Sequence, residues 1–348
     1  MTKFAHFCLN STKSVAGERD FAGCGGFDSP DPERVSNVGP SVGGGGLALE
    51  RTPTPSVDGM TDTFRLADRT VRRVGFGAMQ LPGPGVMGPP RDRDEALRVL
   101  RRAVELGVDH IDTAQFYGPD VSNELIREAL HPYAADLALV SKVGARRDSA
   151  GAWLPAQKPA ELRADVEANL RALGVDRLTA VNLRRMDADA PGAGDVPLED
   201  QVAELADLRD EGKIAGVGLS TVSAADLAAA QAVTEIVCVQ NPFSLVDQTD
   251  ADVLDACTSA GIAYVPYFPL GSAFPHLPKV VDQAPVQAVA ARRGVPAARV
   301  ALAWLLARAD NVLLIPGTSS VAHLEENMAV ADLELTDADL ADLAAVAA

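Results

Sequence analysis

The chain has 348 residues, of which 47% are hydrophobic, so it can bury one large core or two smaller ones. Its formal net charge of −17 at pH 7 argues against a nucleic-acid partner and against an anionic membrane surface, because both require a basic face. No apolar run reaches the roughly 18 residues of a membrane span, and four cysteines without CxxC spacing predict a reduced, cytoplasmic protein.

Residues 1–59 differ in composition from the rest of the chain. They hold 10 of the 29 glycines, including the run Gly43–Gly46, and they show no periodic apolar pattern. Such a segment cannot bury enough apolar surface to offset the conformational entropy that ordering would cost. We therefore predict a disordered N-terminal extension over residues 1–59, with a targeting or regulatory tail as the alternative, and a folded domain over residues 60–348.

Short apolar runs alternate with amphipathic stretches from residue 63 onward. Thr63–Leu66 and Thr70–Val74 flank a short polar turn and predict a β-hairpin. Eight runs are typical of strands buried on both faces of a parallel sheet. They are Val74–Ala78, His110–Thr113, Leu137–Lys142, Thr179–Leu183, Gly216–Ser220, Ile236–Gln240, Ala263–Tyr267 and Val312–Pro316.

The stretches between these runs predict helices, and most of them end at a glycine or before a proline. They are Asp94–Leu106, Ser122–Leu130, Glu161–Leu173, Leu198–Glu211, Ala224–Ala232, Asp250–Ala260, Pro285–Arg293, Ala297–Ala309, Val321–Ala329 and Asp337–Val346. Gly75 and Gly77 lack the third glycine of a dinucleotide fingerprint, because position 80 is Gln80. We interpret these two glycines as packing room under the mouth of a barrel.

Eight strand–helix units of roughly thirty residues predict either a barrel or a long doubly wound sheet. Polar residues stand at the carboxyl ends of nearly all the predicted strands, where a barrel brings them to one mouth and an open sheet spreads them along an edge. These residues are Asp112, Lys142, Arg184, Ser220, Gln240, Tyr267 and Ser319. We therefore predict an α/β fold, a (β/α)8 TIM barrel with an N-terminal β-hairpin.

An acid, a phenol and an amine stand at the ends of two successive predicted strands. Asp112 and Lys142 end the strands, and Tyr117 lies on the loop after Asp112. A phenol is a weak acid with a reference pKa near ~10, and a neighbouring ammonium lowers that pKa. The three residues predict a proton donor tuned toward neutral pH, and the alternative is a purely structural ion pair between Asp112 and Lys142.

The order Asp112, Tyr117, Lys142 resembles the catalytic residues of the aldo-keto reductases, which are (β/α)8 barrels that reduce carbonyls with a nicotinamide cofactor. The resemblance covers roughly residues 63–347, and several blocks in the right order are more specific than any one of them. The further blocks are Gly218–Ser220, Val239–Asn241, Pro266–Gly271 and Ile315–Ser320 followed by Glu326–Asn327.

This resemblance implies reduction of an aldehyde or ketone with NADP(H), in which Tyr117 protonates the carbonyl oxygen. Tyr267 would stack on the nicotinamide ring and Gln240 would bond its carboxamide, although each could instead pack or bond locally. The implied cofactor-binding set is Ser220, Gln240, Asn241, Tyr267, Leu270, Pro316, Gly317, Thr318, Ser319, His323, Glu326 and Asn327.

The residues before the predicted helix at Val321 suit an anion, because backbone N–H groups and the helix dipole point there. By resemblance, Gly317–Ser320 would hold the adenosine phosphate, and Glu326 with Asn327 would contact the adenine. His323 stands where related enzymes often have Arg, so we expect a weaker preference for NADPH than in those relatives. The alternative is an ordinary helix N-cap formed by Ser320.

One residue departs from the family pattern, which usually has His at the end of strand four. Arg184 stands there, and a guanidinium cannot shuttle a proton but can polarise a carbonyl oxygen. Its alternative role is an ion pair with Asp187. Branches with Arg here include bacterial pyridoxal reductase-like members, which the run Val181–Arg184 also resembles, so pyridoxal is a candidate substrate.

The expected partner is a small-molecule carbonyl, and the sequence does not indicate the oligomeric state. We predict no metal site, because the five histidines lack ligand spacing. Substrate choice would depend on mouth loops such as Gly83–Arg91, Arg146–Gln157 and Ser272–Pro278. Two alternatives remain: a non-catalytic, cofactor-sensing regulatory subunit on the same barrel, and a lyase that uses Lys142 as a Schiff base.

Overall fold

The computed structural model describes residues 63–186, 196–271 and 278–346. The predicted N-terminal extension over residues 1–59 and its boundary with the folded domain lie outside these residues, so both stay predictions. Among the described helices, none is both long and apolar enough to cross a membrane.

The described residues form a parallel sheet that curls into a barrel. Its seven strands are hydrogen bonded in the order β3, β4, β5, β8, β9, β10 and β11. Their bounds are β3 (Phe76–Gly77), β4 (His110–Asp112), β5 (Ala138–Val143), β8 (Ala180–Arg184), β9 (Val217–Ser220), β10 (Ile236–Gln240) and β11 (Ala263–Tyr264). The predicted eighth strand is a short bridging segment, in which Val312 pairs with Tyr264 and Leu314 pairs with Val74. The predicted (β/α)8 barrel is therefore confirmed, with a minimal eighth strand.

Closure between the first and eighth strands requires two glycines. A Cβ atom at Gly77 would lie 2.5 Å from the carbonyl oxygen of Ile315, and one at Gly317 would collide with the carbonyl oxygen of Gly77. The Gly75 N–H donates to the Leu314 carbonyl at 2.8 Å, so the two backbones run in direct contact. The interpretation of Gly75 and Gly77 as packing room is confirmed, because a Cβ at Gly75 would also meet the His110 ring.

The predicted N-terminal hairpin is present as β1 (Thr63–Leu66) paired antiparallel with β2 (Arg69–Arg72). Its buried Leu66 and Val71 pack in one cluster with small residues that begin the barrel strands, including Ala138 and Ala180. The hairpin therefore covers the amino-terminal end of the barrel and leaves the carboxyl-terminal mouth open for a site.

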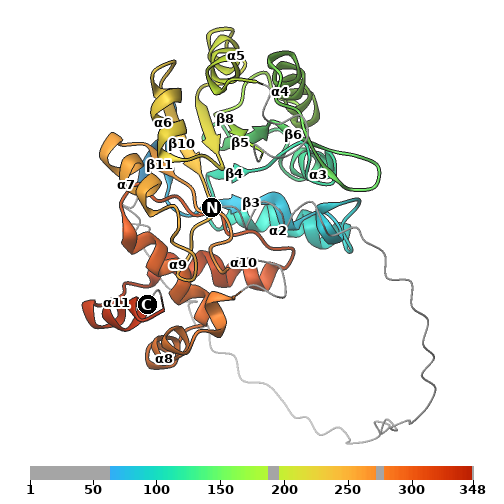
Figure 1. Cartoon of the computed structure of the whole chain (residues 1–348). Coiled ribbons are helices and arrows are strands. Elements are labelled where there is room, and N and C mark those ends of the chain that lie inside the picture. Colours follow the sequence, from blue (N-terminus) through green and yellow to red (C-terminus); the bar gives the residue numbers. More distant parts are fainter. Residues whose placement is uncertain (1–62, 187–195, 272–277, 347–348) are drawn as a thin grey trace, which may run out of the picture. The chain divides into compact units, whose positions relative to one another are not determined.

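Helices surround the strands, as Figure 1 shows. Every predicted helix is present among the described residues, with ends that differ by at most two residues. Their bounds are α2 (Arg93–Glu105), α3 (Val121–Leu130), α4 (Pro159–Leu173), α5 (Leu198–Asp210), α6 (Ala224–Gln231), α7 (Ala251–Ala260), α8 (Ala284–Arg293), α9 (Ala297–Arg308), α10 (Val321–Met328) and α11 (Asp337–Ala344).

A second hairpin was missed by the sequence prediction. β6 (Ala145–Arg147) pairs antiparallel with β7 (Trp153–Pro155), directly after β5, in the segment that we expected to be a mouth loop. Each strand has three residues, which is too short for an alternating pattern to be recognised. The hairpin begins two residues after β5 and so lies close in sequence to Lys142 at the mouth.

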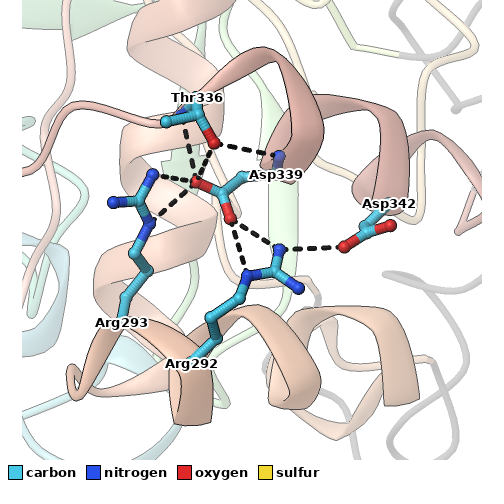
Figure 2. A network of polar contacts seen from close by, with 5 residues as sticks. All are labelled: Arg292, Arg293, Thr336, Asp339 and Asp342. Carbon is cyan, nitrogen blue, oxygen red and sulfur yellow. Dashed lines mark hydrogen bonds and ion pairs between the residues drawn. The ribbon is translucent and has the colours of Figure 1, made fainter.

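A buried carboxylate joins α11 to α8 (Figure 2). The side chain of Asp339 is 1% exposed and binds Arg293 and Arg292, the latter at 2.6 Å. It also accepts the backbone N–H of Thr336 at 3.0 Å and so caps α11. These donors, Arg293 foremost and then Arg292, hold the pKa of the Asp339 carboxyl well below its usual range.

We expect Asp339→Asn to lower the thermal midpoint by several degrees at pH 7, because two guanidinium groups lose their carboxylate. The Asp339 carboxyl has a lower pKa in the folded protein than in the unfolded chain, where it lies near ~3.9. Its ionised form therefore stabilises the folded state above that unfolded pKa, and this stability is lost as the pH falls toward the folded pKa. The difference between wild type and variant should therefore narrow below about pH 4. Thermal unfolding at pH 7 and at lower pH measures this difference in midpoint.

Asp342→Asn is the control, because Asp342 is the exposed partner of Arg292, and it should change the midpoint less. A difference that grows on acidification would contradict this account.

Candidate active site

The ends of β4 and β5 bring Asp112 and Lys142 together inside the barrel mouth. Each residue is 4% exposed, and the Lys142 ammonium binds Asp112 Oδ1 and the carbonyl oxygen of Thr113 at 3.1 Å. The second carboxylate oxygen of Asp112 accepts a hydrogen bond from Gln240 Nε2 at 3.0 Å. Gln240 ends β10, and three strands, β5, β8 and β9, lie between β10 and β4 in the sheet. This contact therefore reaches across the mouth.

Tyr117 lies against this ion pair, as the sequence predicted. The Lys142 ammonium is 5.0 Å from the centre of the Tyr117 ring, and Tyr117 is only 5% exposed. Burial raises the pKa of the phenol, and the charge of Lys142 opposes this only partly, so the pKa stays above its ordinary value. The predicted shift toward neutral pH is therefore not present in this structure, because the sequence does not reveal how fully the phenol leaves water. Tyr117 keeps its proton at neutral pH and can act as a donor.

Lys142 remains a cation in this environment. Burial lowers the pKa of its ammonium, but Asp112 and then Tyr117 raise it by more, so the net shift is upward. A Schiff base needs a neutral amine. The geometry therefore argues against the lyase alternative and favours Lys142 as a fixed positive charge beside the phenol.

Arg184 lies at the end of β8 and faces the two mouth tyrosines. Its charge lowers the pKa of Tyr117 and of Tyr267, although burial of each phenol is the larger influence and raises both values. Arg184 Nη1 donates to the Thr221 hydroxyl at 3.4 Å. Asp187, the alternative ion-pair partner, lies outside the described residues.

Thr221 is a mouth residue that sequence reasoning missed. Its φ is +62°, and the turn is held by Asn241 Oδ1, which accepts the Thr221 N–H at 2.9 Å. Asn241 Nδ2 in turn donates to Asp250 Oδ2 at 3.0 Å. The Thr221 hydroxyl then lies 3.3 Å from the Tyr267 hydroxyl. Asn241 therefore supports the turn at Thr221. The available sequence signal for Thr221 was that it directly follows Ser220.

The predicted phosphate segment lies at the start of α10. Gly317 and Ser319 are exposed there, Pro316 and Thr318 are buried, and α10 exposes His323 and Glu326 while it buries Asn327. Ser320 is the N-cap residue of α10, as the alternative predicted, but its side chain makes no capping hydrogen bond among the described residues. Instead, Glu95 Oε1 from α2 accepts the Val321 N–H at 3.0 Å. Exposed backbone amides at a helix N-terminus fit an anionic phosphate.

The remaining predicted cofactor residues also lie at the mouth. Ser220 is fully buried at the end of β9, and Tyr267 and Leu270 are partly exposed on the segment that follows β11. The structure therefore gathers Asp112, Tyr117, Lys142, Arg184 and Gln240 at the carboxyl ends of the strands. No group of metal-ligating side chains is found in the described part of the chain.

Residues 73–348 match the model of the aldo/keto reductase family, and the chain belongs to this family. The chain is 50% identical over 283 residues to pyridoxine 4-dehydrogenase of Escherichia coli (strain K12), covering 81% of this chain and 97% of that protein. It is 38% identical over 281 residues to an uncharacterized oxidoreductase of Schizosaccharomyces pombe, and the match covers 81% of this chain and 88% of that protein. The family resemblance seen in the sequence is confirmed.

Solved structures share the fold. An aldo-keto reductase from Klebsiella pneumoniae, in complex with NADP and acetate, matches with a TM-score of 0.67 and 25% identity over 81% of this chain and 94% of that one. The glycerol dehydrogenase of Gluconobacter oxydans matches with a TM-score of 0.70 and 22% identity, and the match covers 82% of this chain and 94% of that one. The family and these folds identify the chain as an oxidoreductase built on a TIM barrel.

The contact between Gln240 and Asp112 predicts that Gln240 positions the carboxylate. In Gln240→Leu, Asp112 Oδ2 loses its donor, so the carboxylate that holds Lys142 is positioned less firmly. We expect kcat to fall about 10-fold, as the loss of a hydrogen bond to a charged group implies. Cofactor affinity, measured by fluorescence titration, should change less than about twofold. A large loss of cofactor affinity with an unchanged kcat would instead support the carboxamide role that the family resemblance predicts.

Proposed function

We propose that residues 60–348 form an NADPH-dependent carbonyl reductase that accepts pyridoxal and reduces it to pyridoxine. The buried Tyr117 beside the Lys142–Asp112 ion pair is the observation that supports this function most strongly. The name of the Escherichia coli relative, pyridoxine 4-dehydrogenase, describes the same alcohol–aldehyde pair.

Bound NADPH would supply the hydride for the carbonyl carbon. Tyr117 gives its proton to the carbonyl oxygen, and the O–H bond of the phenol breaks as the alcohol forms. Lys142 stabilises the tyrosinate that results, while Asp112 keeps the ammonium in place. Arg184 adds a second positive charge near the developing oxyanion.

The cofactor would bind along the ends of the last four strands. Tyr267 would stack on the nicotinamide, and Ser220 and Leu270 would contact the same end of the cofactor. The backbone amides of the exposed residues Gly317 and Ser319 would take the adenosine phosphate at the start of α10. The Klebsiella relative was solved in complex with NADP, which supports this cofactor. His323, Glu326 and Asn327 lie on the helix that begins there.

We also infer a cytoplasmic enzyme with a small-molecule substrate and no nucleic-acid partner. The net charge of −17 supports the last point. Both described cysteines, Cys238 and Cys257, are free and buried, and reduced thiols fit the cytoplasm.

The direct test is NADPH oxidation with a panel of aldehydes that includes pyridoxal, in wild type and in Tyr117→Phe. The variant should lose about 10²–10⁴-fold in kcat and keep its cofactor affinity, because it lacks only the proton donor. Tyr133→Phe is the matched control, since the Tyr133 hydroxyl donates to the Leu173 carbonyl at 2.7 Å. Near-normal turnover by Tyr117→Phe would refute the mechanism. If the enzyme reduces simple aromatic aldehydes but not pyridoxal, the function is that of a general carbonyl reductase.

Cofactor choice tests the phosphate site. A 2′-phosphate adds close to two negative charges, and an arginine can bind it with two hydrogen bonds. His323→Arg should therefore lower the Kd for NADPH by about 3-fold or more and change the Kd for NADH by less than about 2-fold. Fluorescence titration with both cofactors measures this. Equal changes for both would place His323 away from the 2′-phosphate.

A further inference from the structure

A carboxylate from another helix occupies the start of α10. Glu95 belongs to the first turn of α2, and its Oε1 accepts the Val321 N–H at 3.0 Å. The two residues are 226 positions apart in the sequence, so the contact depends on how α2 and α10 pack. Glu95 thus puts a negative charge at the end of α10 where the helix dipole favours an anion.

This charge is ionised and held in place. Glu95 Oε2 accepts a hydrogen bond from Arg98 at 2.6 Å, and the ion pair between Arg102 and Glu325 at 2.8 Å joins the same two helices. The Val321 N–H, and then Arg98, lower the pKa of the Glu95 carboxyl below its ordinary value. The Arg98 side chain is 59% exposed, so water screens its charge and it offsets the carboxylate only in part.

The same helix start is the proposed site of the adenosine phosphate. The amides proposed for that phosphate are those of Gly317 and Ser319, and Ser319 precedes Val321 by two residues. Two residues of chain span at most about 7 Å, which is comparable to the Debye length of about 8 Å at physiological ionic strength. A phosphate bound at Ser319 therefore experiences the charge of Glu95.

We propose that Glu95 is a cofactor-selectivity residue, whose carboxylate repels the 2′-phosphate and so reduces the preference for NADPH over NADH. The 2′-phosphate carries close to two negative charges, and NADH lacks it. The hydrogen bond from Val321 is common to both cofactors, so only the charge of Glu95 discriminates between them. This inference rests on the proposed phosphate site, where His323 lies on the same helix.

The test measures the Kd of the full chain for NADPH and for NADH by fluorescence titration, without substrate. Glu95→Gln keeps an oxygen acceptor for the Val321 N–H and removes the charge. It should lower the Kd for NADPH by about 3-fold or more and change the Kd for NADH by less than about 2-fold, and added salt should reduce this contrast. Adenosine 2′,5′-bisphosphate and 5′-AMP differ by the same phosphate and should show the same contrast.

Two control variants separate the charge of Glu95 from its hydrogen bond. Glu95→Asp shortens the side chain by one methylene, so it keeps the charge and weakens the bond to the Val321 N–H. Glu105→Gln removes the same charge from the other end of α2, about 15 Å along the helix. Both should leave the ratio of the two Kd values within about 2-fold of wild type. If either control raises the preference for NADPH as much as Glu95→Gln does, the inference is overturned.

His323→Arg separates the failure of this inference from the failure of the proposed phosphate site. If His323→Arg tightens NADPH selectively and Glu95→Gln does not, the phosphate site stands and the role of Glu95 is wrong. If neither variant changes the ratio, the phosphate binds elsewhere, and the inference falls with the proposed site. If Glu95→Gln weakens both cofactors equally, Glu95 only caps α10, and the inference is overturned. These titrations need no turnover, so they decide the role of Glu95 even if wild type reduces no aldehyde.

Discussion

The buried ion pair between Lys142 and Asp112 is the interaction on which the mouth of the barrel depends. Removing one partner of such a pair leaves an uncompensated buried charge, which typically costs about 3–5 kcal/mol. The structure satisfies both groups, since Lys142 also donates to the Thr113 carbonyl and Asp112 also accepts from Gln240. Tyr117 lies against the cation, so Lys142 favours its phenolate, while Asp112 helps to keep the ammonium charged.

Barrel closure is what allows this arrangement. The first and eighth strands meet through the glycine backbones at positions 77 and 317, and the curled sheet then faces the ends of β4 and β10 across the mouth. The two short hairpins lie at different places on the barrel. The β1–β2 hairpin covers the amino-terminal end with Leu66, and the β6–β7 hairpin places Trp153 beside the reaction site.

The sequence predicted the barrel and the positions of Asp112, Tyr117 and Lys142, because buried strands with polar ends and glycine-terminated helices are local patterns. It did not predict contacts between residues distant in the chain. Glu95 on α2 caps α10, and Asn241 holds the strained turn at Thr221. Neither interaction leaves a periodic pattern in the sequence. The direction of the Tyr117 pKa shift was also wrong, since it depends on how far burial outweighs the charge of Lys142.

The ionisation of Tyr117 in the free protein tests this account most directly. A difference titration of tyrosinate absorbance, wild type minus Tyr117→Phe, isolates this one phenol. The account predicts that its pKa lies above the ordinary phenol value near ~10, because burial outweighs the neighbouring ammonium. A pKa near neutrality would contradict it and would show that the charge of Lys142 controls the proton donor.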